Sequence, residues 1–322
     1  MSQTSTAYDW HKLEAAADQP VVITDNATLA KWCQHWQTLP MVALDTEFQR
    51  VETFYPIPGL IQLADDQQCY LIDPLSVTDF EPLKALFQNK NVLKVLHAAS
   101  EDLELFQNSL GVLPEPVFDT QVAAAFLNWG FSMGLQRMLQ EILGVEVQKH
   151  ETTSNWLRRP LSESQERYAA LDVAYLPAIC QKQKDALEAR GMLEWLQQES
   201  EAMLRQAIDE DPEGAEYYKR FTQMWTLPAN KIAALRDLTA WREQTCRDRD
   251  VPRNRILRNQ ALLEIVNQWP QSVYDLSRVD DIKRAIIRND GKQILTFLQN
   301  AQHSAEQSPP EPILRPLPFF WN

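Results

Sequence analysis

Residues 42–48, VALDTEF, form an apolar run that contains two carboxylates. Its composition predicts a buried strand. Because side chains alternate faces along a strand, Asp45 and Glu47 point the same way, opposite to Val42, Leu44, Thr46 and Phe48. Two like charges repel each other where burial removes the screening water. One carboxylate must therefore stay protonated, or a cation must lie between the two.

The composition is that of a soluble globular protein. The chain has 322 residues, 44% of them hydrophobic and 23% charged, which leaves room for two domains. The first twenty residues show no basic segment followed by an apolar run, so we expect no secretory signal. No window approaches the roughly 18 uninterrupted apolar residues of a membrane span. The four cysteines are scattered, which predicts reduced thiols and a cytoplasmic location.

Charge is divided unevenly along the chain, whose net charge is −13. Residues 1–226 carry 17 Lys and Arg against 33 Asp and Glu, whereas residues 227–302 carry 13 against 9. This division predicts two domains with different tasks. The basic part can attract phosphate, while the acidic part needs a cation before it can accept it.

Strands and helices alternate in the first half, which predicts a mixed α/β sheet covered by helices. We predict strands over 20–25, 41–48, 59–65, 68–73 and 91–98. We predict helices over 27–38, about 79–88 and 100–111, with Ser100 as the N-cap of the last. Asp66 and Gln67 form a short connection that indicates an antiparallel hairpin, and Asp119 is the N-cap of a further helix.

The second half is predicted to be helical. Residues 209–226 begin with an acidic stretch that contains Pro and Gly, which indicates a linker. Residues 227–302 show only helical periodicity, with stops expected at Pro252, Pro270 and Gly291. Residues 303–322 form a Pro-rich tail that we expect to be extended.

Two further acidic positions break the pattern around them. Asp172 falls on the face of a predicted helix where the period calls for an apolar residue, and Tyr168 lies one turn before it. Asp102 lies in the first turn of the helix after the strand that ends at His97, where a side chain can face the ligand crevice of an α/β sheet.

Each of these signals also has a purely structural interpretation. Asp45 and Glu47 can end an exposed strand, and Asp102 can simply favour the positive end of its helix dipole. Tyr168 can be a packing residue. We interpret Asp119 as a helix cap and His97 as a core histidine. The joint spacing favours a common site.

Together these segments resemble the DEDD family of 3′→5′ exonucleases, in particular its ribonuclease D branch. The resemblance runs through LDTEF (44–48), YPIPGLIQL (55–63), YLIDP (70–74), VLKVLHAASEDLELF (92–106), FDTQ (118–121), NWLRRPLSESQ (155–165) and YAALDVAYL (168–176). In the basic part, LRDLTAWREQ (235–244) and GKQILTFL (291–298) resemble the HRDC module. The resemblance implies a ribonuclease-H-like exonuclease domain over 20–208, a linker over 209–226 and an all-α HRDC bundle over 227–302.

The resemblance also implies a catalytic set of Asp45, Glu47, Asp102, Tyr168 and Asp172. Its four carboxylates are implied to be the ligands of two divalent cations, and oxygen-only ligands favour Mg²⁺ or Mn²⁺ over zinc. Asp45 is implied to bridge both ions, Glu47 and Asp172 to hold the ion that activates water, and Asp102 to support the other. Tyr168 is implied to position water, since a phenol with a pKa near 10 is a poor base at neutral pH.

RNA contacts are predicted in both domains. Thr46 and Phe48 are candidates beside the carboxylates. In the basic part, RDRDVPRNRILR (247–258) holds five arginines, of which we predict RNA contacts for Arg253, Arg255 and Arg258. A solvated surface explains that run equally well.

The function predicted from the resemblance is a metal-dependent 3′→5′ exoribonuclease that trims structured RNAs such as tRNA precursors. We expect a monomer with RNA as its partner and without an organic cofactor. One competing interpretation is a DNA exonuclease of the same superfamily, and another is an inactive RNA-binding adaptor. The presence of all five site residues disfavours the adaptor. A phosphatase that uses a DxD nucleophile is weaker still, because the second acid is Glu47.

Overall fold

The computed structural model describes residues 9–50, 52–147, 154–208, 211, 213–221 and 224–309. Its contacts divide the chain into two units. The first takes the described residues up to Gln49 together with Pro56–Ile208, and the second takes Arg50–Tyr55 and the described residues after Ile208. Among the described residues, no helix combines the length and apolar character needed to span a bilayer.

The first unit is built on a six-stranded mixed sheet of order β1-β4-β3-β2-β5-β6. Its strands are β1 (Val21–Ile23), β2 (Met41–Gln49), β3 (Ile57–Ala64), β4 (Cys69–Ile72), β5 (Leu93–Leu96) and β6 (Val117–Asp119). β2, β3 and β4 form an antiparallel meander, while β5 and β6 run parallel to β2 and β1 runs parallel to β4. The predicted hairpin at Asp66 and Gln67 is confirmed.

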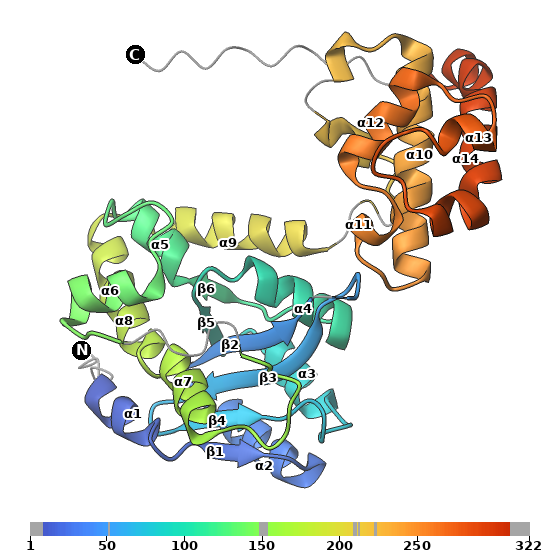
Figure 1. Ribbon diagram of the computed structural model, residues 1–322. Helices are drawn as coiled ribbons and strands as arrows, with labels where there is room; N and C mark the ends of the chain where they lie inside the picture. Colours follow the sequence, from blue (N-terminus) through green and yellow to red (C-terminus); the bar gives the residue numbers. More distant parts are fainter. Residues whose placement is uncertain are drawn as a thin grey trace. The chain divides into compact units, whose positions relative to one another are not determined.

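Helices cover both faces of this sheet (Figure 1). They are α1 (Trp10–Ala16), α2 (Asn26–Trp36), α3 (Glu81–Gln88), α4 (Ser100–Leu110), α5 (Thr120–Phe126), α6 (Leu135–Leu143), α7 (Glu163–Ala174), α8 (Leu176–Ala189) and α9 (Leu193–Ala207). One core joins α2, α3 and α4 to the sheet, and the other joins α1, α5, α6, α7 and α8 to its opposite face. The predicted α/β architecture is confirmed.

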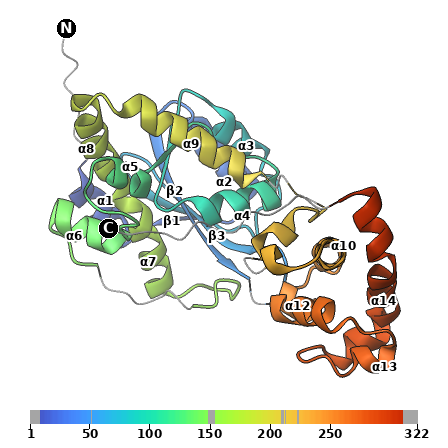
Figure 2. The same cartoon turned by 90° about the horizontal axis from the view of Figure 1, so that it is seen from above.

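The second unit is helical, as predicted (Figure 2). Its elements are η1 (Tyr217–Arg220), η2 (Met224–Thr226), α10 (Ala229–Asp248), α11 (Arg253–Ile256), α12 (Asn259–Gln268), α13 (Val273–Leu276) and α14 (Arg284–Gln307). Residues 209–226 were predicted as a linker, and Tyr218, Phe221 and Met224 from that range are buried in the core of this unit.

The prediction of a helix stop at Gly291 is wrong, because Gly291 lies inside α14. A Cβ at this position would approach Leu276 to 3.4 Å, so the glycine serves close packing against α13. The prediction of an extended tail from residue 303 is also wrong as far as Gln307, the last residue of α14. Residues 310–322 lie outside the described residues.

The predicted N-cap role of Ser100 is wrong as well. Ser100 is the first residue of α4, and the cap position falls on Ala99, which offers no side-chain acceptor. The Asp119 carboxylate instead accepts hydrogen bonds from the backbone N–H groups of Ala98 and Ala99, at 3.1 and 2.9 Å. Asp119 also caps α5, as predicted.

The helix predicted around Asp172 is two helices. α7 ends at Ala174 and α8 begins at Leu176, with Tyr175 at the junction. Pro177 has no N–H to donate to the carbonyl four residues earlier, so the helix cannot continue unbroken. Tyr175 turns instead to α1, where its hydroxyl donates to Glu14 at 2.8 Å.

Candidate active site

β2 presents Asp45 and Glu47 on the face of the sheet that α7 covers. Met41 and Ala43 of the same strand belong to the α7-side core, and Val42 and Leu44 to the opposite core. The alternation therefore places both carboxylates toward α7, as the sequence predicts. Both are only partly buried, since β2 runs past the edge of the core at this point.

α7 supplies Asp172 and Tyr168, one helical turn apart and both half-buried. α7 packs across β2, β3 and β4, which brings Asp172 next to Asp45. The Tyr168 phenol forms a hydrogen bond with the Asp172 carboxylate. Burial and then the Asp172 charge raise the pKa of Tyr168, so the phenol stays protonated at neutral pH.

Asp102 comes from α4, on the other face of the sheet, and is close enough to Asp45 and Glu47 for their charges to interact. It lies in the first turn of α4 and is only 6% exposed. The Thr46 hydroxyl, which points to the α4 side of β2, donates a hydrogen bond to the Asp102 carboxylate. The hydroxyl predicted to contact RNA is thus occupied within the protein.

The four carboxylates repel one another. Burial and then Asp172 raise the pKa of Asp45 well above its ordinary range, and burial and then Asp45 do the same for Asp102. Burial, Asp45, Asp172 and Asp102 raise the pKa of Glu47 to about 9. Burial raises the pKa of Asp172 to about 7, although the hydrogen bond from Tyr168 opposes the shift. Without a bound cation, most of these carboxyl groups therefore hold their protons at neutral pH.

The donor set fits hard divalent cations. All four side chains offer only carboxylate oxygens, the ligands that Mg²⁺ and Mn²⁺ prefer. Within the described part of the chain, no Lys, Arg or His forms an ion pair with any of the four. The same part of the chain contains no three acidic, His or Cys side chains already arranged as a metal-binding group. A bound cation would have to draw these carboxylates together.

A loop fixed by Arg159 packs over β3 beside this site. The Arg159 guanidinium donates to the Asp73 carboxylate at 2.6 and 2.9 Å and to the carbonyls of Gly59 and Trp156. The buried Trp156 ring lies 6.2 Å from the Tyr168 ring.

Gly59 makes this packing possible. It is the extra residue of a β-bulge, since Glu47 pairs with Leu60 and Phe48 with Pro58. A Cβ at Gly59 would lie only 2.7 Å from the Trp156 Cβ. The sequence analysis missed both Arg159 and Gly59, although each lies in a segment that carries the family resemblance.

The arginines predicted to bind RNA all have carboxylate partners in the helical unit. Arg253 donates to Glu243 at 2.7 Å, Arg258 lies 3.4 Å from Asp281, and Arg255 pairs with Glu52. Their side chains are 41%, 62% and 51% exposed, respectively. Arg255 and Arg258 are therefore the more accessible, while Arg253 belongs to an internal cluster.

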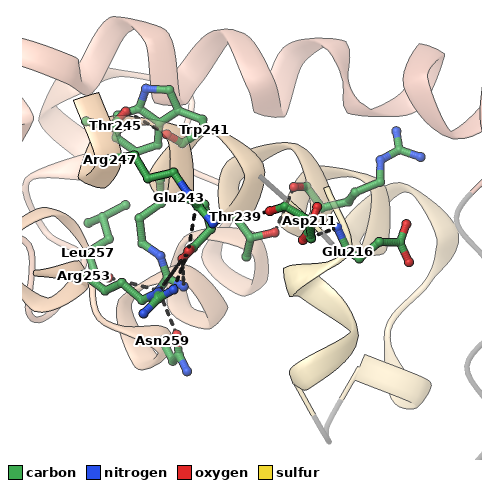
Figure 3. Close-up of polar contacts among 12 residues, drawn as sticks. Asp211, Glu216, Thr239, Trp241, Glu243, Thr245, Arg247, Arg253, Leu257 and Asn259 are labelled. Atoms are coloured by element: carbon green, nitrogen blue, oxygen red, sulfur yellow. Dashed lines mark hydrogen bonds and ion pairs between the residues drawn. The ribbon is translucent and has the colours of Figure 1, made fainter. Parts of the chain in front are cut away.

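That cluster surrounds Glu243, which is 1% exposed and accepts from Arg242, Arg247 and Arg253 (Figure 3). Arg242 is itself fully buried and also donates to the Leu257 carbonyl and to Asn259. Sequence reasoning missed this cluster. The sequence does contain a signal for it. Arg242 occupies a position of α10 where the helical period that runs through Leu235 and Leu238 calls for an apolar residue, as Asp172 does on α7.

The segment between β2 and β3 belongs to this helical unit. The N–H groups of Phe54 and Tyr55 donate to one Asp250 oxygen at 2.9 and 3.2 Å. The guanidinium groups of Arg247 and Arg253 lie 4.9 and 4.8 Å from the Phe54 ring. The chain that leaves the carboxylates on β2 thus passes directly into the helical unit.

Comparison with known proteins agrees with the two units. A family model described as 3′-5′ exonuclease matches residues 20–188, and the HRDC domain model matches residues 232–298. Ribonuclease D of Pseudomonas paraeruginosa is 41% identical over 300 residues, which cover 92% of this chain and 78% of that protein. Ribonuclease D of Escherichia coli is 40% identical over 294 residues, covering 91% of this chain and 78% of that protein.

Solved structures show the same fold. The crystal structure of Escherichia coli RNase D, described as an exoribonuclease involved in structured RNA processing, superposes with a TM-score of 0.86 at 38% identity. The match covers 93% of this chain and 80% of that one. Brucella melitensis NrnC with bound Mg²⁺ shares the fold at a TM-score of 0.51 and 22% identity, over 58% of this chain and 90% of that one. The chain therefore belongs to the ribonuclease D family and is a 3′→5′ exoribonuclease.

Proposed function

We propose that Asp45, Glu47, Asp102 and Asp172 hold two divalent cations, Mg²⁺ or Mn²⁺, and that the enzyme releases nucleoside 5′-monophosphates from the 3′ end of RNA. The observation that supports this is that the four carboxyl groups raise one another's pKa values and have no Lys, Arg or His as an ion-pair partner among the described residues. When bound, such ions neutralise the phosphoryl oxygens and activate the attacking water.

The protein's own groups position the reactants. Thr46 fixes the orientation of the Asp102 carboxylate by donating to it. Tyr168 keeps its proton because its pKa is raised, so it acts as a hydrogen-bond donor near Asp172 and not as a base. Phe48 is half-buried at the end of the same strand and stays a candidate for contact with the RNA.

We infer that the substrates are structured RNAs such as tRNA precursors. The description of the Escherichia coli relative as an enzyme of structured RNA processing supports this class. In the helical unit, the exposed Arg255 and Arg258 are the candidates for contact with the RNA body. A monomeric state, a cytoplasmic location and the lack of an organic cofactor stay predictions.

The test is incubation of the purified chain with RNA and DNA oligomers labelled at the 3′ or the 5′ end, with Mg²⁺ or with EDTA. We expect loss of the 3′ label first, mononucleotide products, a preference for RNA and no cleavage in EDTA. Cleavage that persists in EDTA would contradict the metal assignment. Loss of the 5′ label first would contradict the direction.

Two variants test whether activity depends on the carboxylates of the site and not on any nearby carboxylate. Asp45→Asn should remove activity and weaken Mn²⁺ binding measured by calorimetry, while the circular dichroism spectrum stays that of the folded protein. Glu101→Gln is the matched control, since Glu101 is an exposed carboxylate next to Asp102 in the same helical turn. Wild-type turnover in Asp45→Asn would refute the assignment of this carboxylate.

A further inference from the structure

Phe131 is the most exposed large hydrophobic side chain in the part of the chain that the structure describes, with 91% of its surface open to solvent. It lies between α5 and α6, in the segment Asn128–Gly134. Single exposed apolar residues are common and need no function. The surroundings of Phe131 set it apart from that ordinary case.

The segment around Phe131 is anchored on both sides of the ring. Asn128, just after the end of α5, has a φ of 58°, which Asn adopts readily, whereas the φ of 49° at Ser132 is unfavourable for that residue unless neighbouring contacts support it. The Trp129 N–H donates to the Ala124 carbonyl at 2.9 Å. The Met133 carbonyl accepts from Gln121 at 3.1 Å, and the Met133 side chain is 2% exposed. The ring is therefore presented from a fixed backbone.

The segment leads directly to a pocket that Tyr168 and Asp172 line. Gly134 and Leu135 line a pocket of about 300 Å³ whose wall also includes Tyr168, Leu171 and Asp172. Three residues span at most about 10 Å, so the Phe131 backbone lies within that distance of the pocket wall at Gly134. A distance of this size corresponds to one or two nucleotides along a single strand.

We propose that Phe131 stacks on a base near the 3′ end of the single-stranded RNA that enters this site. The inference rests on the proposed assignment of Asp172 and Tyr168 to the active site. An aromatic ring on a fixed backbone loses little entropy when a base covers it. Stacking accepts every base because each has a π-face, which suits an enzyme that removes nucleotides one after another.

The test compares Phe131→Ala, Phe131→Leu, Phe131→Trp and Trp195→Ala in hydrolysis of a short single-stranded RNA. Trp195, 58% exposed on α9 of the same unit, is the matched control because it does not line the pocket. We expect Phe131→Ala to raise KM by about 5-fold to about 140-fold, with kcat nearly unchanged. Phe131→Trp should keep the wild-type KM, Phe131→Leu should resemble Phe131→Ala, and Trp195→Ala should resemble the wild type.

A substrate without one base identifies stacking directly. We compare RNA oligomers in which one of the last three nucleotides lacks its base. When the missing base is the one that stacks on Phe131, the wild type and Phe131→Ala should have the same KM. A wild-type KM in Phe131→Ala, or full rescue by Phe131→Leu, would overturn the proposal.

The same comparison can be made without turnover. Fluorescence anisotropy of a labelled RNA oligomer in EDTA should show weaker binding by Phe131→Ala, and equal binding would overturn the proposal. Loss of hydrolysis in the wild type would instead contradict the proposed function, so the two failures are distinguishable.

Discussion

Replacing Gly59 by alanine tests whether the packing over β3 positions Tyr168. The new Cβ would lie 2.7 Å from the Trp156 Cβ and 2.9 Å from the Trp156 carbonyl oxygen. Ordinary contact begins at 3.4 Å, so the two atoms must move by about 0.7 and 0.5 Å. Backbone atoms cannot swing aside as a side-chain end can. Trp156 must therefore shift, and its ring lies against Tyr168.

We expect this change to lower both stability and turnover. Overpacking of this kind costs about 1–3 kcal/mol. For a unit of this size that corresponds to a fall in Tm of roughly 2–12 °C. Displacement of Tyr168 by a fraction of an ångström should lower kcat on the order of tenfold. Thermal unfolding and hydrolysis of a short RNA oligomer measure the two effects.

Two other glycines of the same unit serve as controls. At Gly134 a Cβ meets nothing within 4 Å, so Gly134→Ala should leave Tm unchanged. At Gly130 the nearest atom is the Met133 Cε at 2.8 Å, the flexible end of a side chain, so Gly130→Ala should be milder than Gly59→Ala. Wild-type Tm and kcat in Gly59→Ala would refute the claim that this close approach positions Tyr168.

Three further predictions concern the rest of the molecule. Burial lowers the pKa of Lys94 to about 7, so unfolding takes up a proton between about pH 7 and 10.5 and the wild type gains stability as the pH rises through this range. In urea titrations the free energy of unfolding of the wild type should therefore rise relative to that of Lys94→Met by at most about 5 kcal/mol, and a constant difference would contradict the shift. Glu243→Gln leaves the buried Arg242 without its charge partner and should lower the free energy of unfolding by about 3–5 kcal/mol. A loss below about 1 kcal/mol, as expected for an exposed ion pair, would contradict a tightly coupled buried cluster. Replacing Arg255 and Arg258 by alanine should weaken binding of tRNA-length RNA and flatten the slope of log affinity against log salt by roughly 0.7–0.9 per lost contact, whereas identical slopes would make them ordinary surface.

Local periodicity was sufficient to predict which residues share a face. The alternation in VALDTEF correctly placed Asp45 and Glu47 on one side of β2, because a strand has a period of two whatever surrounds it. The four-residue spacing of Tyr168 and Asp172 likewise put them on one face of α7. The resemblance to the exonuclease family then proposed which acids act together.

Periodicity was insufficient wherever a distant residue supplies the partner. Ser100 has the composition of an N-cap, but Asp119 satisfies the N–H groups before α4 because β5 and β6 are neighbours in the sheet. Gly291 resembles a helix stop, but α13 packs against it and the helix continues. A local rule describes the free chain, and a tertiary contact of similar energy can override it.

Period and composition were enough to predict the fold class and the helical nature of the basic half, and the family resemblance proposed the carboxylates of the candidate site. Only the tertiary structure showed that Arg253 is held by Glu243, that Thr46 donates to Asp102 and that Phe131 is exposed. The physical reason is that an ion pair, a hydrogen bond or an exposed ring depends on which segments meet in space. No spacing along the chain specifies that meeting, since the partners lie on separate elements whose packing the whole core decides.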